Sequence, residues 1–137
     1  MTETVQDLPA DIAAVMATWP SAVRRRALDL RALTFDVAAR TNGVGPLTET
    51  LKWGEPAYLT AATGSGTTLR IAPVRGDEAV CGLFVNCRTT LVDTFRERFG
   101  DSLDCRGDRL VAVPTTGAVP QEVGACIALT LTYFRWR

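Results

Sequence analysis

The chain has 137 residues, of which 47% are hydrophobic and 22% charged, and its fifteen acidic and fifteen basic residues balance at neutral pH. This length fits one domain with its own core, and the absence of net charge disfavours a nucleic-acid-binding protein, which normally needs a basic face. The sequence contains no histidine, which excludes Ser-His and Cys-His nucleophile pairs and H-E-x-x-H zinc sites.

The sequence predicts neither a membrane span nor a secretory signal. Its apolar runs are far shorter than the roughly 20 residues of a transmembrane helix. The N-terminal segment MTETVQDLPAD is acidic and polar, whereas a signal peptide is basic and then apolar. We therefore expect one domain over residues 1–137 in the cytoplasm, with no membrane partner and with about residues 1–6 as a flexible N-terminus.

The first forty residues predict two helices. Asp7 and Pro9 suit a helix start, with Asp7 as the cap, and a short apolar stripe follows. Pro20 opens a second helix, which Asn42-Gly43 ends. The apolar residues of the second helix recur at helical spacing: Val23, Ala27, Leu30, Leu33 and Val37.

From about residue 47 the pattern changes to that of short strands. The predicted strands cover residues 47–53, 57–61, 67–73, 79–86, 103–106 and 109–113. We expect a turn at residues 54–56, a flexible hairpin loop at 64–66 and a two-residue turn at Gly107-Asp108. Residues 91–99 predict an inserted helix, and Pro120 opens the last one. This order indicates an α+β fold, an antiparallel sheet packed with N-terminal helices, an inserted helix and a C-terminal helix.

Two segments carry a family resemblance. The octapeptide LKWGEPAY, residues 51–58, resembles the W-G-x-P-x-[YF] signature of the YdhG-like, Fra-type family of domains of unknown function. The segment CGLFVNCRTTLVDTFRERFG, residues 81–100, is similar to the strand-then-helix half of that family. The resemblance extends from about Trp19 to the final helix. It implies a YdhG-like fold and, because some members are described as frataxin-like iron chaperones, an iron-binding alternative.

The octapeptide is also the predicted binding site. Its glycine and proline restrict the backbone, so a structural role alone can explain the motif. Alternatively, Lys52, Trp53, Glu55 and Tyr58 bring two aromatic rings, a cation and a carboxylate to one cleft, the mixed lining of a small-molecule pocket. Lys52 is the only lysine among the fifteen basic residues, which favours a role for a compact ammonium group. We expect Trp53 to be partly buried, with one ring edge open to the cleft.

Three functions remain open at this point. The first is a non-catalytic domain, without a cofactor, that binds an unidentified small molecule or protein at this cleft and is a possible homodimer. The second is an iron metallochaperone, for which Asp93 and Glu97 lie one helical turn apart, although Arg96 and Arg98 would compete as ion-pair partners. An enzyme ranks third, because the sequence contains few groups suited to acid–base catalysis.

The four cysteines do not predict a metal site. Cys81, Cys87, Cys105 and Cys126 have no C-x2-C spacing. In a reducing compartment they are interpreted as free thiols and small buried hydrophobic residues.

Overall fold

The structure, a computed structural model, describes residues 7–137. Within this range six strands form one antiparallel sheet in the order β1-β2-β3-β4-β6-β5. The strands are β1 (Thr48–Lys52), β2 (Glu55–Leu59), β3 (Leu69–Val74), β4 (Asp77–Phe84), β5 (Asp104–Arg106) and β6 (Leu110–Pro114). The predicted α+β fold is confirmed. The prediction of a flexible N-terminus concerns residues 1–6, which lie outside the described residues.

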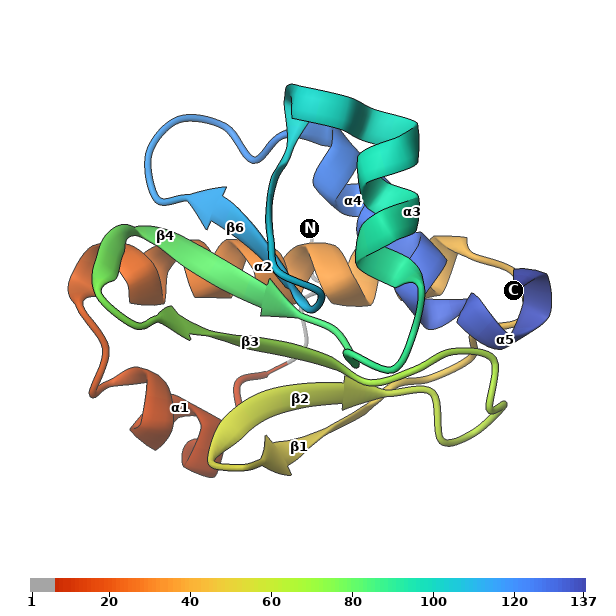
Figure 1. Ribbon diagram of the computed structural model, residues 1–137. Helices are drawn as coiled ribbons and strands as arrows, with labels where there is room; N and C mark the ends of the chain where they lie inside the picture. The colour runs from red at the N-terminus through yellow and green to blue at the C-terminus, as the bar shows by residue number, and fades with distance from the viewer. Residues whose placement is uncertain (1–6) are drawn as a thin grey trace.

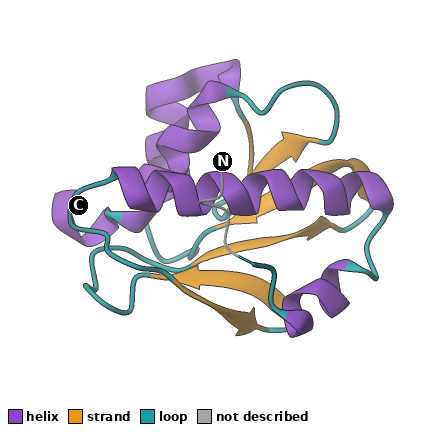
Figure 2. Ribbon diagram, turned by 180° about the vertical axis from the view of Figure 1, so that it is seen from behind, coloured by secondary structure: helices purple, strands orange, loops and turns teal. Residues whose placement is uncertain are grey.

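Helices cover one face of the sheet. The longest, α2 (Ser21–Arg40), lies across the sheet beside α4 (Gln121–Leu131), as Figure 2 shows from the helix side. The inserted helix α3 (Leu91–Phe99) packs against α4 and β5. The short helices are α1 (Ala10–Met16), the 3-10 helix η1 (Gly100–Ser102) and α5 (Tyr133–Trp136). In the part of the chain described, no helix covers the other face of β2, β3 and β4, which is toward the viewer in Figure 1.

The core lies between the sheet and α2 with α4. Leu30 of α2 and Ile127 of α4 are fully buried against the sheet residues Ile71 and Leu83. Because side chains alternate along a strand, the residues between these core positions must point to the open face. The helix period of α2 and the strand period of β3 and β4 thus create one apolar layer between helices and sheet. The opposite face of the sheet stays uncovered by the described helices.

The first turn differs from the prediction. Trp53 and Gly54 alone form it, and Lys52 pairs directly with Glu55 across the hairpin. Pro56 therefore lies inside β2 rather than in the turn. The sheet tolerates the proline because β2 pairs with β3 only at Ala57 and Tyr58, so no hydrogen bond to β3 is lost at position 56. The predicted Asp7 cap is also wrong, since α1 begins after Pro9 without a side-chain cap.

The β2–β3 loop is packed against the C-terminal end of α4 rather than projecting as a flexible hairpin loop. The Ser65 hydroxyl is buried and donates to the Leu131 carbonyl oxygen at 2.7 Å. A Cβ atom on Gly66 would lie 2.3 Å from the carbonyl carbon of Leu131. Only glycine fits at this close approach, so the loop ties the sheet to α4.

A buried ionic network joins α2 to the β1–β2 hairpin. The Arg31 guanidinium donates from Nε and Nη2 to the two carboxylate oxygens of Glu49, at 2.6 and 2.9 Å. The Tyr58 hydroxyl donates to the same carboxylate at 2.8 Å. Phe35 meets the Tyr58 ring edge-on and lies 5.1 Å from the Arg31 guanidinium carbon. Arg31 also donates to the Asp7 carbonyl oxygen, which places the chain entering α1.

Burial and charge shift two pKa values in this network. Burial, reinforced by the negative charge of Glu49, raises the pKa of Tyr58 well above its usual range. The hydrogen bonds to Glu49 raise the pKa of Arg31. Both shifts keep the proton donors of the network protonated.

Replacing Glu49 should be costly. We expect Glu49→Gln to lower the free energy of unfolding by about 3–5 kcal/mol, because it leaves the buried Arg31 cation without its counter-charge. Urea denaturation measures this change. Asp36→Asn, which removes the exposed partner of Arg40 in α2, is the control and should cost under about 1 kcal/mol. Equal losses in the two variants would contradict the structural role of the network.

Stability should fall at alkaline pH in a way that depends on Tyr58. The unfolded chain releases the tyrosine proton near its ordinary pKa of about 10, whereas folded Tyr58 retains it, so the stabilisation present below pH 10 is lost as the pH rises. The advantage of the wild type over Tyr58→Phe should shrink by up to about 1.4 kcal/mol per pH unit above pH 10. Urea denaturation at pH 9 and 11 tests this, and a constant difference would contradict it.

Candidate functional site

The turn between β1 and β2 places Trp53 in an unusual backbone conformation. Trp53 has φ +56° and Gly54 has φ +75°, so both central residues of this two-residue hairpin have positive φ, as a type I′ turn requires. Glycine adopts this region freely, but a bulky residue is strained there. Within residues 7–137, Trp53 is the only non-glycine residue with positive φ.

The Trp53 side chain extends into solvent. It is 91% exposed, so the expectation of a partly buried ring is wrong. The strained turn lifts the indole off the end of the hairpin rather than folding it onto the sheet. The indole therefore adds almost nothing to the core.

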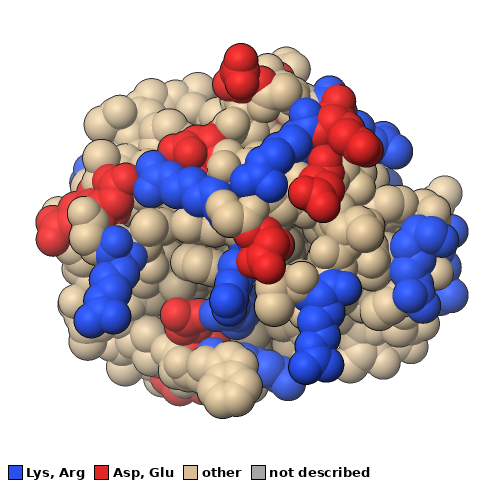
Figure 3. Space-filling model, viewed as in Figure 1, with Lys and Arg blue, Asp and Glu red and all other residues tan. Residues whose placement is uncertain are grey.

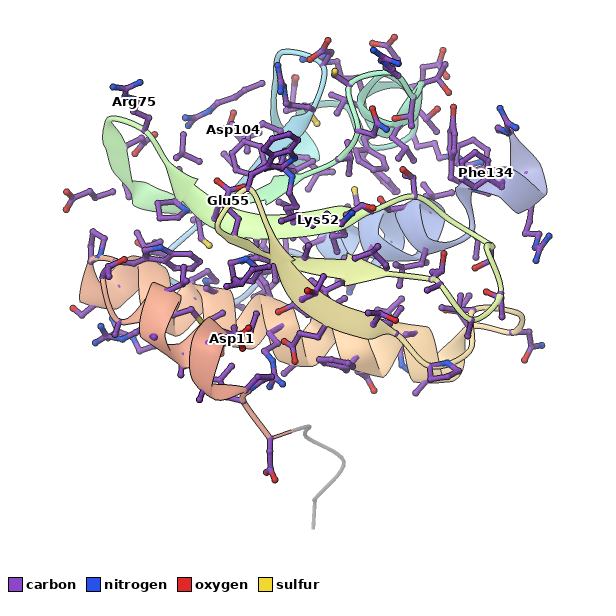
Figure 4. All side chains as sticks on the ribbon, turned by 90° about the horizontal axis from the view of Figure 1, so that it is seen from below. Asp11, Lys52, Glu55, Arg75, Asp104 and Phe134 are labelled. Carbon is purple, nitrogen blue, oxygen red and sulfur yellow. The ribbon has the colours of Figure 1, made fainter. Side chains whose placement is uncertain are left out.

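The four predicted site residues do not share one cleft. Lys52 and Glu55 are paired across the hairpin and point to the open face; Figure 4 shows both on the side of the sheet away from α1 and α2. Tyr58 lies an odd number of residues from Glu55 on the same strand, so it points to the helix face. There it is fully buried against Phe35 and Glu49, and the prediction that it lines the cleft is wrong.

A pocket of about 260 Å³ opens beside the turn on the open face. Three basic side chains line it: Lys52 from β1, Arg70 from β3 and Arg109 from the β5–β6 turn. Thr68 and Asn86 add polar groups to its wall. None of the lining residues is a carboxylate, so we call it the basic pocket.

The three cations differ in how far they are neutralised. Arg70 is ion-paired to Glu55 and lies 5.3 Å above the centre of the Phe84 ring, so it is held in place. Arg109 has only a loose contact with Asp108, at 3.8 Å. Lys52 forms no ion pair with any described residue. Lys52 and Arg109 thus leave positive charge available to an anion.

The other half of the open face is acidic and internally paired. Arg106 contacts Asp77 at 3.0 Å and Asp104 at 2.7 Å. The hydrogen bond from Arg106 lowers the pKa of Asp104. Basic and acidic side chains consequently alternate over this side of the molecule instead of forming one large patch of either sign (Figure 3).

The sequence analysis did not predict that Arg70 and Arg109 line this pocket. Arg70 and Arg109 lie far apart in the chain, and only strand pairing brings them together: Arg70 lies opposite Phe84, which in turn lies opposite Leu110. The sequence did contain one usable signal. Arg70 interrupts an otherwise apolar strand, Leu69–Val74, which marks a strand with one solvent-facing position.

The candidate iron ligands do not form a site with other ligand residues. Asp93 and Glu97 are both exposed on α3, and Asp93 contacts Arg96 at 3.6 Å. Within residues 7–137, no group of three or more His, Cys, Asp or Glu side chains could hold a metal ion. Iron binding by Asp93 and Glu97 stays a prediction.

The four cysteines differ in burial. Cys81 and Cys126 are buried, and burial raises the pKa of each thiol to about 12. Cys105 is half-buried. Cys87 is exposed and lines the basic pocket, so the interpretation as a buried hydrophobic residue is wrong for this one.

Comparisons with protein-family models, with curated proteins and with solved structures found no match to this chain. The resemblance of the octapeptide to the YdhG-like family therefore stays a prediction. Among the helices described, none combines the length and the apolar character needed to cross a membrane.

The strain at Trp53 can be measured. Asparagine tolerates positive φ, so Trp53→Asn should raise the free energy of unfolding by about 0.5–1 kcal/mol if the exposed ring contributes little to the core. Gly54→Ala is the control and should lower stability by about 1 kcal/mol, since alanine is strained at φ +75°. Urea denaturation reports both, and a clear loss in Trp53→Asn would show that the indole stabilises the fold.

Proposed function

We propose that this protein binds a small anionic ligand in the basic pocket and performs no chemistry on it. One observation carries the proposal. Lys52, Arg70 and Arg109 come from three separate segments and line one pocket without a carboxylate among its lining residues. Three positive charges close together repel one another, although the whole chain has no net charge. A bound anion would offset this repulsion.

The geometry supports different roles in ligand binding for these three cations. Arg70 is held by Glu55 and Phe84, so it forms a fixed floor to the pocket. Lys52 and Arg109 are exposed and can close on the ligand from two sides. Arginine offers parallel N–H donors that match a carboxylate or phosphate, and lysine supplies a compact charge.

The lining gives little support to catalysis. The chain has no histidine, and the pocket has no carboxylate, so the usual general bases are missing from it. The nucleophilic side chains in the lining are Lys52, Thr68 and Cys87, and none of them is hydrogen-bonded to a side-chain base among the described residues. Binding is therefore the simpler role.

Charge-matched variants test the proposal. Inorganic phosphate, titrated calorimetrically at constant ionic strength, should bind the wild-type protein. Lys52→Ala and Arg109→Ala should each weaken binding about tenfold, the loss of one charge-assisted contact of about 1.4 kcal/mol. Arg40→Ala, which removes an exposed cation from α2, changes the net charge equally and should bind as the wild type does.

Two outcomes would contradict the proposal. One is the absence of measurable phosphate binding at millimolar concentrations. The other is an equal loss of affinity in Arg40→Ala and Lys52→Ala, because it would show a response to net charge rather than to a site. Circular dichroism of each variant confirms that the exposed substitutions leave the fold intact.

A further inference from the structure

The position of Trp53 has no structural explanation. Its indole is 91% exposed, and it stacks on no aromatic or cationic side chain among the described residues. Its backbone is strained at φ +56°, in a turn where asparagine or glycine would be relaxed. A large ring held in water by a strained turn is a cost to folding, and such outliers point to a function.

Trp53 also lines the basic pocket together with Lys52, its neighbour in the chain. If the basic pocket binds an anion as proposed above, its ligand can be assigned more closely, and we infer that it is a mononucleotide. Its planar base stacks on the Trp53 indole, and its phosphate lies between Lys52 and Arg109. This assigns the chemical class that the anion site alone leaves open.

The phosphate end follows from the charges. A terminal phosphate carries between one and two negative charges at neutral pH, which matches the two cations that are not committed to strong ion pairs, Lys52 and Arg109. Thr68 and Asn86 add uncharged hydrogen-bonding groups to the same wall. The pocket is small, about 260 Å³, and so suits a compact headgroup rather than a large ligand enclosed on all sides.

The base end follows from the exposed indole. Stacking of a base on an aromatic side chain needs a free ring face, which a 91% exposed tryptophan provides. Stacking does not require a closed pocket around the base, because contact between one face of the base and one face of the indole already contributes affinity. An anion without a ring would gain nothing from Trp53.

The surrounding charge limits the ligand to a single nucleotide. Asp77 and Asp104 occupy the other half of the open face and share one cation, Arg106. A phosphate backbone that continued along the open face toward β4 and β5 would meet these carboxylates. Because basic and acidic side chains alternate on this side of the molecule (Figure 3), there is no extended basic face along which a longer strand would release counter-ions.

Isothermal titration calorimetry with four probes tests the inference: AMP, adenosine, inorganic phosphate and a short single-stranded oligo-dA. We expect AMP to bind at least tenfold more tightly than phosphate or adenosine, and the oligonucleotide to bind no better than AMP per site. Trp53→Asn should reduce AMP affinity to that of phosphate and leave phosphate affinity unchanged. Lys52→Ala should weaken AMP and phosphate alike, and Arg40→Ala should weaken neither.

The outcomes separate this inference from the proposed function. Equal affinities for AMP and phosphate would overturn the assignment of a nucleotide and leave anion binding standing. Full AMP affinity in Trp53→Asn would overturn base stacking on Trp53. Tighter binding of the oligonucleotide would overturn the restriction to one nucleotide. Failure of both phosphate and AMP to bind would overturn the anion site itself. Trp53→Phe, which keeps an aromatic face, should retain more AMP affinity than Trp53→Asn, and the reverse order would overturn stacking.

Discussion

The bidentate ion pair between Arg31 and Glu49 determines how the β1–β2 hairpin lies on the fold. Both carboxylate oxygens of Glu49 accept hydrogen bonds from Arg31, and one also accepts from the Tyr58 hydroxyl. Burying these charges is tolerable only because each is paired, so α2, β1 and β2 can meet in one register only. A shift by one residue would carry Glu49 to the open face and leave Arg31 buried without its carboxylate.

This register determines the composition of the open face. With Glu49 and Tyr58 on the helix side, Lys52 and Glu55 must point the other way. Glu55 then holds Arg70, and Arg70 lies over Phe84, whose ring occupies the space above Gly82. A layer of charged and aromatic side chains thus replaces a second helical layer on this face, and the basic pocket forms at its margin, beside the turn.

The sequence predicted the layers of this fold better than its registers. Helical spacing in residues 21–40 and the proline before residue 121 led directly to α2 and α4, because those signals are local. The side on which Tyr58 lies was missed because Glu55 was assigned to the turn; with Glu55 inside a strand, strand alternation alone separates the two residues. The pairing of Arg31 with Glu49, and the approach of Arg109 to Lys52, depend on tertiary contacts that no local pattern encodes.

The sharpest test of the open face as a binding surface is an NMR titration of the indole N–H signals with AMP. Trp53 is exposed at the pocket, whereas Trp19 and Trp136 are half-buried, and the Trp136 indole donates to the Leu129 carbonyl oxygen. Three resolved signals therefore report on three places in the fold. Binding in the basic pocket predicts a saturable shift of the Trp53 signal, lost in Lys52→Ala, with the other two signals unmoved. A Trp53 signal that stays in place while either of the others moves would contradict it.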